Sequence, residues 1–298
     1  MLLTDFIITV FCKIDDMLKK ITKGKRLRKR GPTPQLSDSE VITMEVVGEY
    51  LGKDKEKDIH GYFKRHWSNL FPKIPDRTTF VRQCANLWAI KQKIRQRVVK
   101  MLLQVNQQPL RIIDGFPMPI CNFRRAYFSK IFKDHCAYGY CASKNQNYYG
   151  FKGHLLVDAY GTIVDVIVAP ANIDERTAIF DMAQGILSKL LGDKGYILKE
   201  SRKQELQEMG IEVETPLRNN MRETRSPVYL RWMNKTRRII ETVIGQLAER
   251  FHIEKVRARD LWHLTNRITR KLLAHNLAQL IACTQGIFNL RFDHLISA

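Results

Sequence analysis

A change in hydrophobic periodicity at Gln108 and Pro109 constrains the fold of this chain of 298 residues more than any other feature. Before it, apolar residues recur every three or four positions, the period of an amphipathic helix. After it, helical stretches alternate with short apolar runs, and two β-branched and aromatic runs, 148–157 and 162–168, flank the turn sequence 158–161. The sequence therefore predicts an α/β fold in which a mixed sheet is flanked by helices and preceded by an all-helical segment.

Three parts of the chain follow from this division. We expect an all-helical, basic domain over residues 1–105, an α/β domain over 106–260, and a C-terminal helical extension over 261–298 that packs on the core. In the first part, Ser37 and Glu40 have the spacing of a helix-capping box. The succession of short helices there resembles a DNA-binding helix-turn-helix region, although a helical bundle with no DNA role has the same pattern.

The order of elements in the α/β domain follows its apolar runs. Two short apolar runs are typical of strands, and each ends on an aspartate: one at Asp114 and the other at Asp193. In order, we expect a strand over 110–114, the hairpin, a helix over 175–190, a strand ending at 193, a helix over 198–209, a strand over 211–215 and a helix over 228–251.

The net charge of the chain indicates a polyanionic partner. Fifty Lys and Arg against 30 Asp and Glu give a formal charge of +20, which repels itself in a compact protein. Nucleic acid is the commonest such partner; an anionic membrane is the rival, but no stretch approaches the ~20 apolar residues of a membrane span. With no export signal and no paired cysteine spacing, we expect a cytoplasmic protein with reduced thiols and no zinc site.

A basic run before Gly31 and Pro32 forms the first candidate contact with DNA. Charge repulsion and proline favour an arm between helices, in which Lys25, Arg28 and Arg30 would bind the phosphate backbone. A solvated linker is the alternative. Arg77, at the start of a later helix, is a further candidate for DNA binding.

Three acids stand in apolar surroundings, where a charge has no structural purpose. Asp114 and Asp193 end apolar strand runs, and Glu241 lies within the helical run 239–244. Three such carboxylates would repel one another unless a cation joined them. Two Mg²⁺ ions (or Mn²⁺ as substitute) about 3.5–4 Å apart can activate an attacking hydroxyl and stabilise the leaving oxygen of a phosphodiester. We therefore predict these acids as catalytic metal ligands, with Asp114 bridging both ions.

Four short runs in the second half of the chain resemble the DDE transposases of bacterial insertion sequences. They are IIDGFP (112–117), YGFKGH (149–154), GDKGY (192–196) and RRIIET (237–242). The resemblance covers residues 108–258 and implies a ribonuclease H-like catalytic domain whose metal-binding triad is Asp114, Asp193 and Glu241. It also implies an enzyme that cuts element ends, exposes 3′-hydroxyls and joins them to target DNA.

The partners and location of the chain follow from the same resemblance. It implies that the partner is double-stranded DNA, both the terminal repeats of the element and the target. It also implies a homodimer in the DNA complex and a place in the bacterial cytoplasm, associated with the nucleoid. Two alternatives stay open: a catalytically inactive DNA-binding protein of the same fold, and a ribonuclease H-like nuclease that never joins strands.

The last helix departs from the motif of a related subgroup in that family. There, Tyr, Arg, Glu and Lys are separated by two, three and six residues. Arg237 and Glu241 match the Arg and Glu, but Asn234 and Ala248 stand at the Tyr and Lys positions. The handling of the flanking strand that goes with the full motif is therefore not implied for this chain.

Several basic residues near the acids are candidates for phosphate contacts. Lys152 and His154 alternate on one predicted strand and therefore share a face, which is either a solvated edge or a phosphate-binding surface. Arg237 stands one helical turn before Glu241 and could orient it or bind the scissile strand. Lys194 and Arg238 complete the predicted DNA-binding set.

Overall fold

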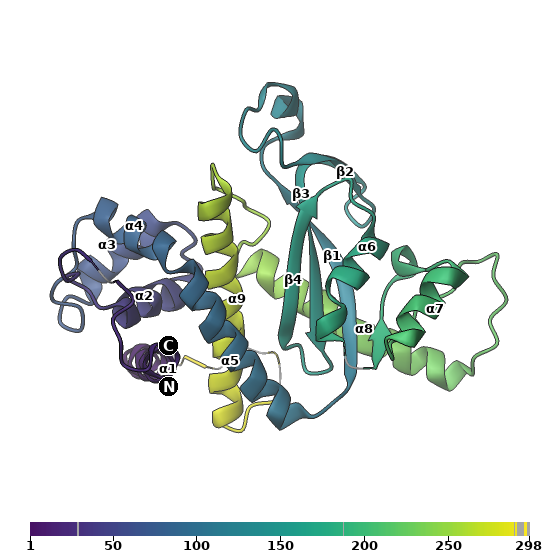
Figure 1. Cartoon of the computed structure of the whole chain (residues 1–298), viewed down its shortest axis with the longest axis horizontal. Coiled ribbons are helices and arrows are strands. Elements are labelled where there is room, and N and C mark those ends of the chain that lie inside the picture. Colours follow the sequence, from purple (N-terminus) through teal and green to yellow (C-terminus); the bar gives the residue numbers. More distant parts are fainter. Residues whose placement is uncertain (29, 187, 289, 291–294, 297–298) are drawn as a thin grey trace. The chain divides into compact units, whose positions relative to one another are not determined.

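Two compact units make up the protein in the computed structural model, which describes residues 1–28, 30–186, 188–288, 290 and 295–296 (Figure 1). The first unit combines Met1–Met101 with Leu247–Ile253 and Ala258–Ala298. The second combines Leu102–Gln246 with Glu254–Arg257. Over the described residues, no helix combines the length and apolar composition needed to cross a membrane.

The first unit is helical, as predicted. The capping box is confirmed: the Ser37 side chain accepts a hydrogen bond from the Glu40 N–H, and the Glu40 carboxylate accepts one from the Ser37 N–H. Helix α2 is buried along most of its length and contacts α1, α3, α4 and α9. The helices are α1 (Leu3–Thr22), α2 (Asp38–Tyr50), α3 (Glu56–His66), α4 (Arg77–Asn86), α5 (Trp88–Asn106), which continues into the second unit, and α9 (Leu261–Thr284).

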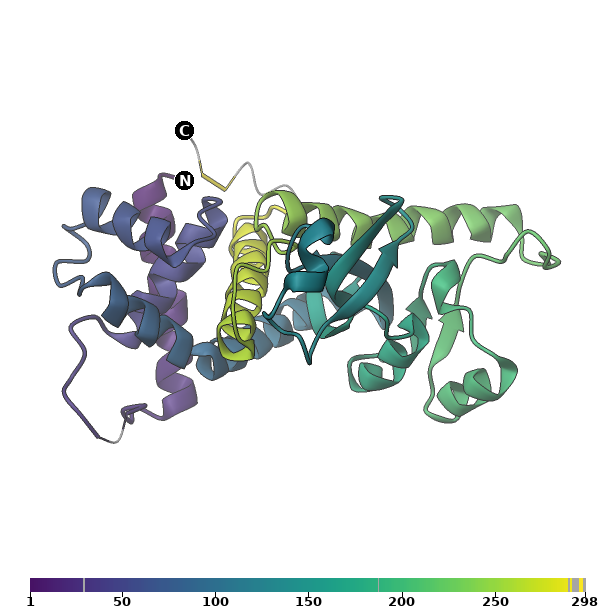
Figure 2. The ribbon, with the colours of Figure 1, turned by 90° about the horizontal axis from the view of Figure 1, so that it is seen from above.

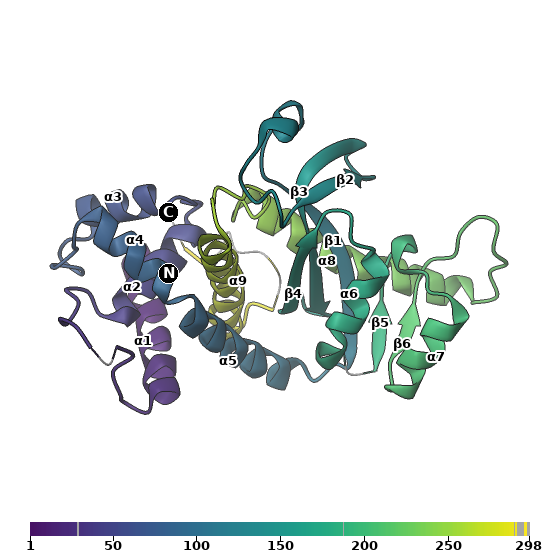
Figure 3. The same ribbon diagram turned by 45° about the horizontal axis from the view of Figure 1, so that its top comes forward.

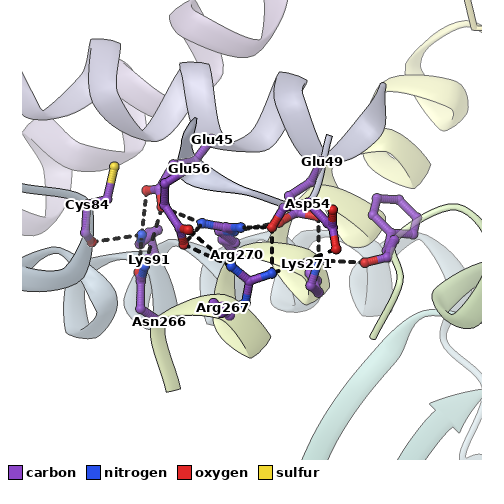
Figure 4. A network of polar contacts seen from close by, with 11 residues as sticks. Glu45, Glu49, Asp54, Glu56, Cys84, Lys91, Asn266, Arg267, Arg270 and Lys271 are labelled. Atoms are coloured by element: carbon purple, nitrogen blue, oxygen red, sulfur yellow. Dashed lines mark hydrogen bonds and ion pairs between the residues drawn. The ribbon is translucent and has the colours of Figure 1, made fainter. Parts of the chain in front are cut away.

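A buried network of ion pairs joins α2 to α9 (Figure 4). Glu49, on α2, is fully buried and accepts hydrogen bonds from Arg270 Nε at 2.5 Å and Lys271 Nζ at 2.7 Å. Arg270 also pairs with Glu56 at 2.6 Å. Burial alone would raise the pKa of Glu56, but Arg270 and Arg267 lower it to about 2. Each of these carboxylates therefore has cationic partners, which buried charges require.

Removing one carboxylate from this network should destabilise the first unit. We predict that Glu49→Gln lowers the free energy of unfolding by about 3–5 kcal/mol, because Arg270 and Lys271 lose their shared counter-charge while still buried. Urea denaturation measures the change. The exposed Glu208 gives the control, since Glu208→Gln should alter the free energy of unfolding by less than about 0.5 kcal/mol. Equal effects of the two substitutions would contradict a stabilising network.

The second unit is built on a six-stranded mixed sheet in the order β2-β3-β1-β5-β6, with β4 also paired to β3. Strand β3 is antiparallel to β1, β2 and β4, and β5 is parallel to β1 and β6. The strands are β1 (Leu110–Pro119), β2 (Ala137–Cys141), β3 (Gln146–Asp158), β4 (Ile163–Pro170), β5 (Lys189–Leu191) and β6 (Glu212–Glu214).

Helices cover the sheet on both faces (Figures 2 and 3). Helix α8 lies on one face, and α6 and α7 lie on the other. A core that includes Ile113, Leu156, Ile179 and Leu206 fills the space under α6 and α7. The helices are α6 (Glu175–Asp181), α7 (Glu200–Glu208) and α8 (Pro227–Glu249), with 3₁₀ turns η1 (Phe123–Phe128), η2 (Ala183–Gly185) and η3 (Lys194–Tyr196). This is the ribonuclease H-like α/β arrangement that the sequence predicted.

Strand β1 is longer than predicted. The expected strand ended at Asp114, but β1 continues as far as Pro119. It pairs with β5 only over Leu110–Ile112, whereas its pairing with β3 continues to Pro119. Beyond Ile112, one edge of β1 therefore needs no N–H donors for β5, and proline is tolerated at such an edge. Asp114 consequently lies within a strand rather than at its end.

The predicted helix over 175–190 is also shorter in the structure. Helix α6 ends at Asp181, the 3₁₀ turn η2 follows, and β5 begins at Lys189. The Gly185 carbonyl accepts a hydrogen bond from Arg111 Nε of β1 at 3.2 Å, so this segment bonds to the sheet instead of to a further helical turn. The hairpin, the helix at α7, the strand at β6 and the long helix at α8 are confirmed.

Candidate active site

The parallel pairing of β1 and β5 brings two of the predicted acids together. Its register matches Ile112 with Leu191. Asp114 and Asp193 each follow two residues later, and neighbouring strands lie about 4.7–4.9 Å apart. The two aspartates are close enough for the charge of Asp193 to raise the pKa of Asp114. Sheet pairing thus places both side chains, which are half-buried, at the same end of β5.

The Asp114 carboxyl group lacks a full counter-charge. Burial is the largest influence and, together with the charges of Asp193 and Glu175, raises its pKa to about 7. The Gly115 N–H, which donates to Asp114 Oδ1 at 2.7 Å, and the guanidinium of Arg237 lower the pKa only in part. A buried carboxylate beside like charges is stabilised by a bound cation, and its oxygen atoms suit a hard one.

Glu175 is a third carboxylate at this position, and the sequence interpretation missed it. It is the first residue of α6, and its Oε1 accepts a hydrogen bond from Lys152 Nζ at 3.1 Å. A Cβ atom added at Gly195 would lie 2.0 Å from Glu175 Oε2 and 3.0 Å from Asp193 Oδ1, so glycine leaves room for both carboxylates. Acids are common in the first turn of any helix, so the sequence carried no signal for this proximity.

Glu241 lies on α8, one turn after Arg237, and its side chain is exposed. Arg237 influences Asp114 and lines a pocket of about 530 Å³ together with Asp193 and Lys194. The helix that carries Glu241 thus passes the two aspartates. Among the residues that the structure describes, however, no three His, Cys, Asp or Glu residues lie close enough to hold a metal ion. The structure brings together the two aspartates but does not gather all three predicted acids.

Lys152 and His154 share one face of β3, opposite to the face of Asp114. Asp114 pairs with Leu155, and side chains alternate along a strand. His154 is fully buried, and its Nδ1 lies 3.2 Å from the Tyr196 hydroxyl. Burial, followed by the charge of Lys152, lowers the pKa of His154 to about 4, so its ring is neutral at pH 7. Neither residue lies on a solvated edge, and the His154 side chain is closed off from solvent.

The remaining predicted DNA contacts lie at the surface. Arg28 pairs with Asp38 at 3.3 Å and still has an exposed side chain. Arg237 is half-buried. The other predicted residues with exposed side chains are Lys25, Arg30, Arg77, Lys194 and Arg238.

The family of the chain is defined by the stretch that holds this site. A model of the transposase DDE domain matches residues 104–261, slightly more than half of the chain. The chain belongs to the transposase DDE domain family. That membership supports transposition as its function and DNA as the molecule on which it acts. A comparison with curated proteins gives no match.

Packing beside Asp114 gives a prediction on stability. Gly153 lies opposite the buried Phe116, and a Cβ atom at Gly153 would lie 2.4 Å from Phe116 Cζ. We expect Gly153→Ala to lower the free energy of unfolding by about 1–3 kcal/mol, because the enclosed ring must shift. Urea denaturation tests this. As the control, Gly245→Ala in α8, where nothing lies within 4 Å, should be neutral or stabilise by up to about 1 kcal/mol. Unchanged stability of Gly153→Ala would show that Phe116 has room to move.

Proposed function

We propose that the chain is a metal-dependent transposase that cuts the ends of a bacterial DNA element and joins the resulting 3′-hydroxyls to target DNA. The observation that carries the proposal is the adjacency of Asp114 and Asp193, with the pKa of Asp114 raised to about 7, in a chain of the transposase DDE family. Two half-buried carboxylates without a full counter-charge are suited to a divalent cation rather than to a structural ion pair.

The acids Asp114, Asp193 and Glu241 would hold two Mg²⁺ ions, with Mn²⁺ as a substitute. All their donor atoms are carboxylate oxygens, which these hard cations prefer. When bound, such ions supply Lewis acidity at the attacking and leaving oxygens of a phosphodiester. Because Glu241 is exposed on α8, its role requires its side chain to approach the aspartates when DNA and metal bind.

The cations around the acids would position the DNA. Arg237 lies within electrostatic reach of Asp114, and Lys194 follows Asp193 directly, so both can contact the phosphates next to the scissile bond. Arg238 is exposed on the same helix and can bind the strand further along. Lys152 instead neutralises Glu175, which leaves that carboxylate less available as a metal ligand. The partner proposed is double-stranded DNA, with a homodimer pairing the two element ends.

Substitution of each proposed ligand should abolish catalysis without abolishing DNA binding. We predict that Asp114→Asn, Asp193→Asn and Glu241→Gln each reduce Mg²⁺-dependent nicking of DNA bearing the element ends by at least about 10³-fold. Binding of the same DNA, measured by gel shift in EDTA, should change by no more than a few fold. Robust nicking by any of these variants would remove that residue from the triad.

Glu175→Gln is the matched control for the third ligand. It removes a carboxylate that influences the pKa of Asp114 but is already paired with Lys152. We expect it to retain nicking within about tenfold of the wild type. Loss of nicking in Glu175→Gln together with its retention in Glu241→Gln would assign the third position to Glu175.

Two outcomes with the wild-type protein separate the alternative functions. Tight binding to the element ends with no Mg²⁺-dependent cleavage would favour an inactive DNA-binding protein. Cleavage without covalent linkage of the 3′-ends to a target duplex would favour a nuclease. A transposase must both cleave and join, and the joined product is visible as a labelled strand of increased length.

The basic arm should supply sequence-independent affinity. We predict that replacing Lys25, Arg28 and Arg30 together by Ala weakens binding to every duplex. The slope of the logarithm of the binding constant against the logarithm of the salt concentration should also become flatter, by roughly 0.9 for each phosphate that the arm no longer neutralises. Fluorescence anisotropy over a salt series measures the slope. The charge-preserving set Lys25→Arg, Arg28→Lys and Arg30→Lys is the control and should keep the wild-type slope. An unchanged slope in the alanine variant would make the arm a linker only.

A further inference from the structure

The segment that leads from β1 into β3, residues 120–146, forms a lobe (Figure 3). It contains η1 and β2. Several of its aromatic rings are exposed. Tyr127 and Phe128 are 86% and 78% exposed, and their rings meet edge to face at 5.3 Å. Further exposed rings of the lobe belong to Phe123, Tyr138 and Tyr140. Such rings leave water when they stack on another flat surface, so they suggest a ligand.

Buried rings hold the lobe against the sheet. Phe132 is buried and lies edge to face with Phe151 of β3 at 5.2 Å. The ring of Tyr138 lies 4.8 Å from that of the buried Tyr149. The lobe is thus anchored from beneath, and its exposed rings are presented outward rather than left over from an incomplete core.

The charge of the lobe matches a polyanion. Residues 120–146 contain five Lys and Arg and a single Asp. Lys144 pairs with Glu254 at 2.5 Å. The other four cations are exposed and form no ion pair within the described part of the chain; they are Arg124, Arg125, Lys130 and Lys133. Aromatic rings among unpaired cations are the combination that binds single-stranded nucleic acid.

A pocket of about 310 Å³ lies at the base of the lobe, where β1 ends. The residues that line it include Pro117, Pro119, Phe123 and Tyr148, and the polar Asn147. Tyr148 is only 5% exposed, and its buried hydroxyl has no hydrogen-bond partner among the described residues. Either an ordered water or a polar atom of a ligand can satisfy such a hydroxyl. Apolar walls with a polar edge match the faces and edge of a nucleobase.

We propose that this lobe binds unpaired bases of DNA next to the cleaved bond, with the exposed rings stacking on bases and the pocket taking one base. Its place relative to the cleaved bond rests on the proposed function, but the binding itself does not. Pro117 follows Asp114 by three residues of β1, about 10 Å along the strand, and lies on its other face, so a DNA strand that leaves the acids must pass from one face of β1 to the other to reach the pocket. Exposed Tyr and Arg are also common in protein interfaces, but the four cations that form no ion pair within the described part of the chain favour a polyanion such as DNA.

The stacking surface is tested by comparing two probes in EDTA, where cleavage does not intervene. They are a 20-base-pair duplex of arbitrary sequence, either blunt or with four unpaired thymidines at one 3′-end. We expect the full-length wild type to bind the tailed duplex at least about fivefold more tightly than the blunt one. In the double variant Tyr127→Ala and Phe128→Ala, the ratio of the two affinities should fall close to one. Phe288→Ala, which removes a ring that is 64% exposed in the first unit, should keep the ratio.

The pocket is tested by replacing each tail nucleotide in turn with an abasic one. We expect the wild-type affinity to fall about fivefold at one position, and the variant Tyr148→Phe with Asn147→Ala to lose this position dependence while keeping the preference for a tail. An equal fall at every position, or none, would overturn a pocket for one base.

An unchanged ratio in a folded Tyr127→Ala and Phe128→Ala variant would overturn the stacking surface. If the sedimentation of that variant also changed, the rings would be assigned to contacts between copies of the chain. Absence of Mg²⁺-dependent cleavage by the wild type, with the tail preference intact, would reject the proposed function and leave the lobe as a DNA-binding surface.

Discussion

The pairing of β1 with β5 is the constraint on which the candidate site depends. It brings together two aspartates from distant parts of the sequence, Asp114 within β1 and Asp193 two residues after the end of β5, so that each carboxylate lies in the field of the other. That arrangement is unfavourable by itself, since like charges in partial burial repel. Glycines at 115 and 195 keep the space around the carboxylates open, and the neighbouring strands fix their position. The sheet thus maintains a concentration of negative charge that a bound cation would stabilise.

The two units of the protein treat buried carboxylates differently. In the first unit, Glu56 has two arginine neighbours and a pKa lowered to about 2. In the second, Asp114 has carboxylate neighbours, Arg237 within electrostatic reach and a pKa raised to about 7. A satisfied ion pair makes a helical unit specific, whereas a carboxylate left without full compensation is typical of a functional site. The contrast within one chain supports the assignment of the candidate active site to the second unit.

The sequence predicted features that depend on neighbouring residues. The capping box at Ser37, the hairpin of β3 and β4 and the amphipathic run of α8 each arise from local periodicity or turn chemistry, and all are confirmed. It could not predict Glu175 beside Asp193, because an acid at a helix start has an ordinary local reason. Nor could it predict the pair of Glu49 and Arg270, which are separated by 221 residues and meet only through tertiary packing. The predicted triad itself stays a prediction, with two of its acids adjacent and Glu241 exposed.

The unpredicted length of β1 has a consequence for the geometry of DNA binding. A strand that ended at Asp114 would leave the acids at the edge of the sheet with nothing beyond them. Because β1 continues to Pro119, a rigid element leads from the carboxylates to the walls of the pocket that contains Tyr148. Pro117 and Pro119 are therefore part of a fixed connection. The pocket wall at Pro117 thus lies about 10 Å along β1 from Asp114, on the other face of the strand.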